Sequence, residues 1–430
     1  MGELLFVANH ADLYNAQEQI MPNGQGPFTH DPNGNVTQGS VILPYPGHPS
    51  RYEVVYLHHY AYGYWPGAEH LTVDMTLDGG LGDVVPGSRE TFSDSLTEKL
   101  TGIPHADGVD YWVLMHGWDT DAFLAFLLDP NGLDTVPVVS HAGSRHVRFW
   151  QLPNFNNNYQ GQMKTTIQGD RIALTTSNSN SPQPYPCIVE LFDFDAANGQ
   201  VDYIMGFPDH SRAYGIEFSP DGSKLYVSGL DSMYQYLDQY DLSLDDTLAI
   251  QNSRTRIYAF DISGVIDPAY DRPDAMEQAP DGRIYVTRAY TNNPWFAIID
   301  QPNEAGLACN FVWNGLDVSP ATLLSGHCNQ LKRYHDSEYT VGIHEPVSRP
   351  ALGISPNPLD ALGWIDMPGL KRNVEVVWRD GSGRTVLDRI CTASGFGVAV
   401  DASGLAEGLY MVELWQKGER KGVLKAVVAR

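Results

Sequence analysis

Hydrophobic and polar residues alternate in short runs along the first 345 residues, and long amphipathic helical patterns are absent. Alternation with a period of two is typical of half-buried β-strands. Six runs rich in β-branched and aromatic residues look equivalent, and their starts lie 49, 59, 60, 53 and 59 residues apart. These runs are residues 3–7, 52–57, 111–115, 171–174, 224–228 and 283–287.

Tight turns precede several of the runs. Residues 219–222 read Ser-Pro-Asp-Gly, residues 279–282 read Ala-Pro-Asp-Gly, and residues 105–108 read His-Ala-Asp-Gly. Proline presets the turn and glycine takes the positive φ angle, so each of these sequences joins two strands tightly. A second apolar strand follows each run. A period of roughly 56 residues with about four short strands fits the blade of a β-propeller.

The pattern therefore predicts an all-β chain in which residues 1–345 form a β-propeller of six to eight blades, with seven favoured. Six blades are visible in the sequence. A seventh would be completed by residues preceding Met1, pairing with residues 333–343. A pair of stacked β-domains is the alternative architecture, but it does not explain the even spacing.

A shift in charge marks a second domain. Residues 354–430 contain 10 Lys and Arg and 9 Asp and Glu, which leaves 17 basic and 43 acidic residues in the first 353. We expect residues 346–353 to be a linker and residues 354–430 to form a small immunoglobulin-like β-sandwich. The acidic propeller argues against nucleic acid as a partner, because phosphate contacts need Lys and Arg. The chain also contains no apolar stretch long enough to span a membrane.

Turn signals follow one another in a particular order in the second domain. They are Ser-Pro-Asn-Pro at 355–358, Arg-Asp-Gly-Ser-Gly at 379–383 and Gly-Leu-Ala-Glu-Gly-Leu-Tyr at 404–410. This order resembles the type A C-terminal sorting domain of proteins exported by the type IX secretion system of Bacteroidota. The motif residues would be Pro356, Asn357, Pro358, Gly383, Gly404, Gly408 and Tyr410.

The first domain has a resemblance of its own. Residues 77–85, 189–195 and 214–222 are similar to segments of WD-like propellers in Bacteroidota surface proteins, where a propeller precedes a sorting tail. Together the resemblances imply export through the type IX translocon to the outer-membrane surface or the medium. They imply no activity. The start of the chain lacks the basic, apolar pattern of a signal peptide, so we expect that Met1 is not the native start.

Catalytic motifs are absent from the sequence. There is no nucleophile elbow, no His-Glu-x-x-His, no phosphate-binding loop and no dinucleotide fingerprint. We therefore expect a secreted or cell-surface binding scaffold without enzymatic activity or catalytic residues, which presents its loops to a surface protein or glycan. The alternatives are an extracellular hydrolase or lyase with an active site in the propeller funnel, and a structural subunit of a surface assembly. An enzyme should show clustered ionisable residues with perturbed pKa values at the funnel mouth.

Residues 56–66 form the densest aromatic segment of the chain. Aromatic faces can stack on sugar rings or on a partner's apolar side chains, although aromatics that pack between blades give the same pattern. His58 and His59 would point to opposite faces of a strand, so no metal site is expected there. The candidate ligand-binding residues are Tyr60, Tyr62, Tyr64 and Trp65.

No cofactor is expected, with calcium left open as an alternative. Carboxylates occur at loop spacing in residues 129–132 and 193–199, but their order is not that of an EF-hand. Four cysteines occur without a Cys-x-x-Cys pair. Cys309 and Cys328 are the candidate disulfide, because both follow the last of the six runs. Closing that loop would contribute roughly 3 kcal/mol in the chain-entropy model.

Overall fold

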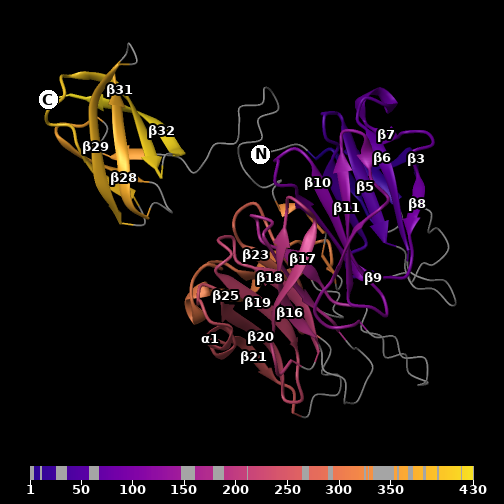
Figure 1. Cartoon of the computed structure of the whole chain (residues 1–430). Coiled ribbons are helices and arrows are strands. Elements are labelled where there is room, and N and C mark those ends of the chain that lie inside the picture. Colours follow the sequence, from indigo (N-terminus) through magenta and orange to yellow (C-terminus); the bar gives the residue numbers. More distant parts are fainter. Residues whose placement is uncertain are drawn as a thin grey trace, which may run out of the picture. The chain divides into compact units, whose positions relative to one another are not determined.

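The chain divides into two compact units, Met1–Tyr339 and Thr340–Arg430, in a computed structural model (Figure 1). The division falls close to the predicted one, although the exact boundary and the linker stay predictions because residues 333–352 are not described. The structure describes all residues except 1–3, 10–11, 26–35, 58–66, 147–159, 178–187, 211, 264–270, 289–293, 324–325, 328, 333–352, 356–357, 367–370, 381–383, 395–396, 418 and 430.

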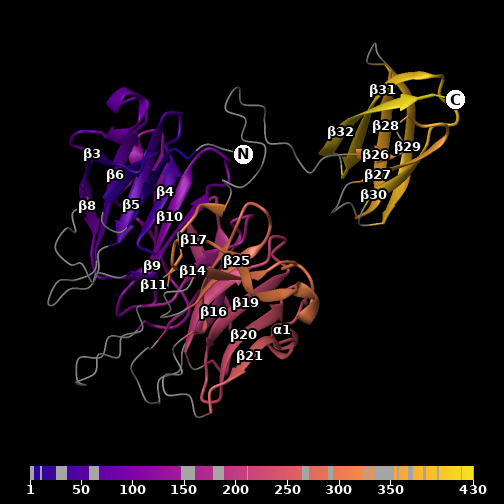
Figure 2. The same cartoon turned by 180° about the vertical axis from the view of Figure 1, so that it is seen from behind.

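Six antiparallel sheets follow one another through the described residues of the first unit (Figures 1 and 2). The first comprises β1 (Phe6–Ala8), β2 (Asp12–Asn15) and β3 (Ile20–Gln25). The second comprises β4 (Ser40–Pro44), β5 (Arg51–Leu57), β6 (Ala68–Asp74), β7 (Asp83–Val84) and β8 (Glu90–Ser93). The third comprises β9 (Leu96–Pro104), β10 (Tyr111–Gly117), β11 (Ala122–Asp129), β12 (Gly132–Leu133) and β13 (Val138–His141).

The remaining three sheets have four strands each. The fourth comprises β14 (Met163–Thr165), β15 (Arg171–Thr175), β16 (Val189–Asp195) and β17 (Gln200–Gly206). The fifth comprises β18 (Ala213–Phe218), β19 (Lys224–Leu230), β20 (Tyr234–Asp241) and β21 (Thr255–Asp261), with the short helix α1 (Thr247–Asn252) between its last two strands. The sixth comprises β22 (Pro273–Gln278), β23 (Ile284–Arg288), β24 (Trp295–Ile299) and β25 (Phe311–Asp317).

Within each sheet the strands pair in chain order, except that β8 pairs with β6 and β13 pairs with β11. The first strands of neighbouring sheets touch. Thus β4 contacts β9, β9 contacts β14, β14 contacts β18 and β18 contacts β22. This is the arrangement of a β-propeller, in which the first strand of each blade lies at the axis. The predicted propeller is confirmed. Five of the six equivalent runs fall on second strands, namely β5, β10, β15, β19 and β23.

The predicted Pro-Asp-Gly turns connect first strands to second strands. Asp221 Oδ1 accepts a hydrogen bond from the Ser223 amide at 2.9 Å, and Gly222 has φ of 70°. Asp281 and Gly282 repeat the same geometry one blade later. The aspartate satisfies an amide that the turn leaves open, and the glycine takes a conformation that other residues avoid.

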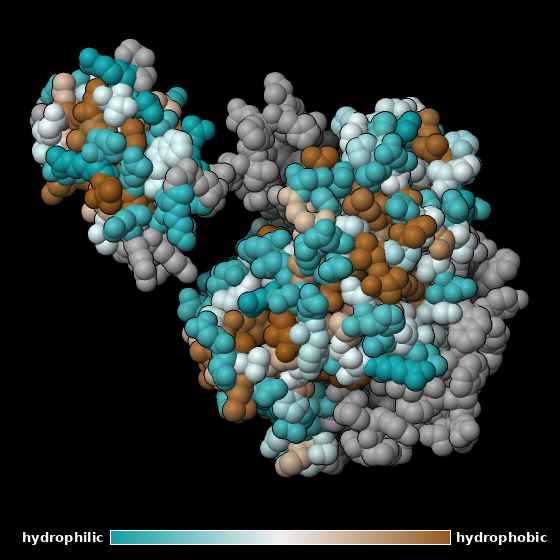
Figure 3. Space-filling model, viewed as in Figure 1, coloured by the Kyte–Doolittle hydropathy of each residue, from teal (hydrophilic) through white to brown (hydrophobic). Residues whose placement is uncertain are grey.

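Hydrophobic cores lie between consecutive blades. Val55 and Val113 pack between the second and third sheets, and Ile172 packs between the third and fourth. Most of the visible surface is polar (Figure 3). Large apolar side chains are nevertheless exposed on or next to the first and sixth sheets. They are Leu4, Leu5, Val7, Val312 and Leu316. The seventh blade stays a prediction.

The second unit is a small β-sandwich, as predicted. Its strands are β26 (Gly353–Ser355), β27 (Leu362–Asp366), β28 (Lys371–Arg379), β29 (Thr385–Ser394), β30 (Gly397–Asp401), β31 (Gly408–Gln416) and β32 (Glu419–Val428), paired in the order β26-β27-β30-β29-β28-β31-β32. A single residue pair joins β30 to β29, so the two halves fold over a shared core that includes Trp378.

Four of the predicted motif residues are described in this sandwich. Tyr410 is buried on β31, and its hydroxyl donates to the Ala406 carbonyl at 2.7 Å, which fixes the turn before the strand. Gly408 begins β31, Gly404 lies in the preceding turn, and Pro358 is exposed. Pro356, Asn357 and Gly383 lie outside the described residues. No helix among the described residues is long and apolar enough to cross a membrane.

Gly215 lies where two inner strands of the propeller approach one another closely. A Cβ atom added to this residue of β18 would lie 2.0 Å from the Asp274 carbonyl oxygen of β22. Gly215→Ala should therefore destabilise the propeller by about 3 kcal/mol, since both groups belong to buried backbone. Calorimetry should show a lower melting temperature for the propeller and an unchanged sandwich. Gly404→Ala, with no atom within 4 Å of the added Cβ, is the control.

Candidate functional site

A group of polar residues gathers at one end of the propeller axis, where the first strands of the blades begin. We call this group the axial mouth and define it as Thr37, Glu98, Gly161, Tyr214, Arg272 and Asp274. Each lies within three residues of the start of β4, β9, β14, β18 or β22. The mouth thus takes residues from five successive blades.

Glu98 is the centre of the axial mouth. Its side chain is buried, with 4% of the residue exposed. Its Oε2 accepts hydrogen bonds from the Thr37 hydroxyl at 2.6 Å and from the Thr37 amide at 2.9 Å. The Thr37 hydroxyl in turn accepts from the Tyr214 hydroxyl at 3.2 Å and the Gly161 amide at 3.4 Å. Residues of four blades therefore meet at the contact between Thr37 and Glu98.

Burial raises the pKa of Glu98 to about 7, although the hydrogen bonds from Thr37 and the charge of Lys99 act in the opposite direction. Burial also raises the pKa of Tyr214, with the nearby Asp274 and Glu98 carboxylates adding to the effect. Arg272 forms an ion pair with Asp274 at 3.2 Å. A carboxyl group that titrates near neutral pH can both accept and donate a proton under physiological conditions.

Two buried histidines lie beside this group. The rings of His116 and His146 stack with centroids 3.7 Å apart. His116 Nδ1 lies 2.7 Å from the Gly117 carbonyl oxygen, so this nitrogen carries the proton. Burial and the charge of Lys99 lower the pKa of His116 to about 3, so the ring is neutral at pH 7. Neither ring nitrogen of His146 has a hydrogen-bond partner among the described residues.

Deeper along the axis, two glutamines link blades that are not neighbours. Gln38 donates to the Met163 carbonyl at 2.9 Å and accepts from the Met163 amide at 2.7 Å. Gln162 makes the same pair of bonds with Met276, at 3.1 and 2.9 Å. Below them, two buried ion pairs cross the axis, Lys164 with Glu277 and Lys332 with Glu217.

The sequence did not single out this site. The predicted ligand-binding residues Tyr60, Tyr62, Tyr64 and Trp65 lie outside the described residues, in the segment that connects β5 to β6, and stay predictions. One signal was available for Glu98 and Lys99. They are adjacent charges within a run of nine residues that is buried throughout as β9, and buried charges in a strand are rare unless they are paired.

The candidate disulfide is also untested as a pair. Cys309 is a buried free thiol in this structure, where it ends the short 3₁₀ helix Gly306–Cys309. Cys328 lies outside the described residues. The pairing therefore stays a prediction.

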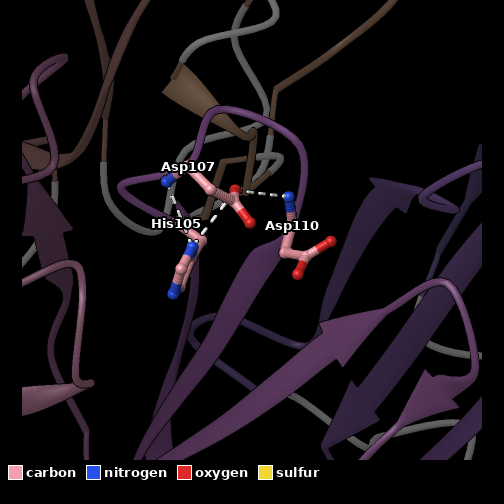
Figure 4. Close-up of side chains that lie close together, drawn as sticks. All are labelled: His105, Asp107 and Asp110. Atoms are coloured by element: carbon pink, nitrogen blue, oxygen red, sulfur yellow. Dashed lines mark hydrogen bonds and ion pairs between the residues drawn. The ribbon is translucent and has the colours of Figure 1, made fainter.

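His105, Asp107 and Asp110 form a cluster with spacing suited to a metal, because their ligand atoms lie within 4.8 Å of one another (Figure 4). Hydrogen bonds within the β9–β10 turn explain the cluster. Asp107 Oδ1 accepts from the amides of Val109 at 2.8 Å and Asp110 at 3.0 Å. His105 Nδ1 accepts from the Asp107 amide, and its Nε2 lies 3.2 Å from the Ala197 carbonyl oxygen.

The predicted calcium alternatives have a similar explanation. Asp129 accepts from the Asn131 amide at 2.6 Å, and Asp195 accepts from the Ala197 amide at 2.9 Å. These carboxylates cap turns, and whether they also hold calcium stays open as a prediction.

Comparisons with known proteins find similar solved structures only at low identity and low TM-score. No protein-family model and no curated protein matches the chain. Similar solved structures include the periplasmic gluconolactonase of Pseudomonas aeruginosa, which is 15% identical. The match covers 88% of this chain and 97% of that chain, with a TM-score of 0.37. A gluconolactonase from Xanthomonas campestris is 12% identical. The match covers 67% of this chain and 80% of that chain, with a TM-score of 0.36. TolB from Acinetobacter baumannii is 12% identical. The match covers 72% of this chain and 61% of that chain, with a TM-score of 0.34.

One expectation needs correction here. We expected a protein without enzymatic activity because a propeller sequence without a catalytic motif is typical of a binding scaffold. Two of the similar solved structures are gluconolactonases, which are enzymes, and a fold does not by itself imply the absence of an activity. The expectation is therefore wrong. At these identities and TM-scores the likeness assigns no particular activity to this chain.

The stability of the propeller should depend on the protonation of Glu98. Its pKa of about 7 in the folded chain lies above the ordinary value of 4.5, so folding favours the protonated form. Its contribution is fully present below about pH 4.5 and is lost as the pH rises through 7. Relative to Glu98→Gln, which cannot ionise, the wild type should lose about 2.5 kcal/mol between pH 5 and 8.

Denaturant unfolding at several pH values measures this difference. Glu90→Gln, at an exposed glutamate of β8, is the matched control and should follow the wild type. A constant difference between the wild type and Glu98→Gln across the range would show that Glu98 has an ordinary pKa.

Proposed function

We propose that the propeller is a hydrolase or lyase whose active site is the axial mouth, with Glu98 as the general acid and base. One observation carries the proposal. A buried carboxyl group with a pKa of about 7 is held by hydrogen bonds from a neighbouring blade at the end of the propeller axis. Groups with such a pKa transfer protons efficiently at neutral pH, and perturbed ionisable groups gather at active sites.

The surrounding residues suit the hydrolysis of an ester or lactone. The Glu98 carboxylate would take a proton from water, and the hydroxide would attack the carbonyl carbon. The C–O bond then breaks, and the proton passes from Glu98 to the leaving oxygen. Thr37 orients Glu98, and the Tyr214 hydroxyl and the Arg272 guanidinium lie at the same mouth, where they would stabilise developing negative charge. The same carboxylate could abstract a carbon-bound proton in a lyase.

We also propose that the sandwich is a type IX sorting domain that directs the protein to the outer-membrane surface or the medium. The order of its turn signals supports this, together with its existence as a compact unit with a core of its own. A separate unit at the end of the chain can be recognised by a translocon without changes to the propeller. The partner would be that translocon.

Hydrolysis of a panel of lactones and carboxylic esters tests the first proposal. Wild-type activity should rise with an apparent pKa near 7, because Glu98 must be ionised to act as a base. Glu98→Gln should lower kcat by about 100-fold or more, the range typical of a lost general base. Glu90→Gln should retain full activity. Equal activity of Glu98→Gln and the wild type on every substrate turned over would refute the proposed role.

Cell fractionation tests the second proposal. The gene with its upstream codons would be expressed in a type IX-competent host, and mass spectrometry would locate the mature C-terminus. We expect a surface or medium product that lacks the segment after about residue 349. A variant without residues 354–430 should remain inside the cell. Its appearance outside in wild-type amounts would contradict a sorting role.

A further inference from the structure

The chain returns to the propeller axis after the sixth sheet. Residues 329–332 belong to none of the strands, and the structure describes all four of them. Leu331 and Lys332 are nevertheless only 4% and 3% exposed. Burial of this depth shows that the segment is inserted into the propeller. We call residues 329–332 the axial strap.

Two side chains anchor the axial strap. Leu331 packs in the core between the second and third sheets. A Cβ atom added to Gly102 of β9 would lie 3.3 Å from Leu331 Cδ1, so the two residues are in close contact. Lys332 forms a buried ion pair with Glu217 of β18. Removing either partner of such a pair leaves an unpaired buried charge, so the contact holds the strap firmly. The strap is thus attached to the third and fifth blades.

Asn329 lies between the blades that carry the mouth and connects them. Its Nδ2 donates to the Leu100 carbonyl of β9 at 2.6 Å. Its Oδ1 accepts from the side-chain amide of Gln38 at 3.3 Å. Leu100 is two residues from Glu98 on the same strand, and Gln38 is adjacent to Thr37, the hydrogen-bond partner of Glu98.

These contacts tie the strand that carries Glu98 to the segment that orients Glu98. Gln38 also forms two hydrogen bonds with the backbone of Met163, so the tie extends to the fourth blade. Loss of the Asn329 amide would remove a hydrogen-bond donor from the Leu100 carbonyl and a hydrogen-bond acceptor from the side-chain N–H of Gln38, both next to the mouth. Movement of Thr37 relative to Glu98 would follow, and water could reach the carboxyl group.

We propose that Asn329 is a positioning residue of the axial mouth, and that the axial strap holds Thr37 and Glu98 in register. The inference rests on the proposed function of Glu98 and deepens it. Asn329 bonds to Leu100 and Gln38 and acts on Glu98 through them, so its role is to fix the backbone on both sides of the catalytic contact.

Two substitutions at Asn329 test the inference. Asn329→Ala removes the amide. Asn329→Asp keeps the shape of the side chain but places an oxygen opposite the Leu100 carbonyl oxygen. If Asn329 only filled space, this variant would behave like the wild type. Both variants should lower kcat about 10-fold with a smaller change in KM, because a small misplacement of a catalytic group has effects of this order or larger. The pH at which activity rises should move below 7 as Glu98 becomes hydrated.

Asn23→Ala is the matched control. The Asn23 side chain donates to Asp83 at 2.6 Å and so joins the first and second sheets away from the mouth. This variant should keep the wild-type kcat and pH profile. Unchanged kcat and pH profile in both Asn329 variants would overturn the inference. If Asn329→Ala melts below the assay temperature, Asn329→Asp, which keeps the side-chain shape but has no donor for the Leu100 carbonyl, provides the comparison in a folded chain.

A direct titration separates this inference from the proposed function. Carbon-13 NMR of the glutamate carboxyl groups, assigned through Glu98→Gln, reports the pKa of Glu98 whether or not a substrate is known. A pKa that falls by about one unit in Asn329→Ala, and stays constant in Asn23→Ala, supports the strap even if no lactone or ester is hydrolysed. The same pKa in all three proteins would refute the strap even if the enzyme is active.

Discussion

Hydrogen bonds that cross the axis are the interaction on which the rest of the propeller depends. Hydrophobic cores join each blade to its neighbours, but Gln38 and Gln162 each bond to the backbone of a blade two places further on. A side-chain amide offers a donor and an acceptor on one planar group, so it satisfies both backbone groups of a single residue. These bonds bring the first strands close enough for a hydroxyl group of the second blade to reach a carboxyl group of the third.

Buried charge is the second consequence of this crowded axis. Lys164, Glu277, Lys332 and Glu217 are all nearly inaccessible to water, and each is paired. Such pairs contribute little net stability compared with apolar packing, but they penalise any arrangement that leaves one member alone. They therefore specify how the blades and the axial strap meet. Glu98 differs from them because its nearest partners are hydroxyl and amide groups, and this leaves its proton free to exchange near neutral pH.

The periodic part of the fold was predictable from the sequence, whereas the axial mouth was not. Second strands are covered on both sides by neighbouring blades, so their β-branched and aromatic runs recur at regular spacing. Thr37 and Glu98 are 61 residues apart, and Thr37 and Tyr214 are 177 residues apart. No local pattern encodes such a meeting, which depends on the twist and number of the blades. Asn329 is further still from Gln38 and lies in a segment without a strand pattern.

Turn chemistry accounts for part of the acidity of this chain. Asp195, Asp261 and Asp317 each accept hydrogen bonds from residues that follow them, and these bonds lower their pKa values. Such carboxylates are structural components that also happen to be charged. An attempt to neutralise the surface by alanine replacement would loosen turns in several blades at once. Charge and shape are therefore not independent design variables in this propeller, and its low isoelectric point can be altered safely only at acidic residues that cap nothing.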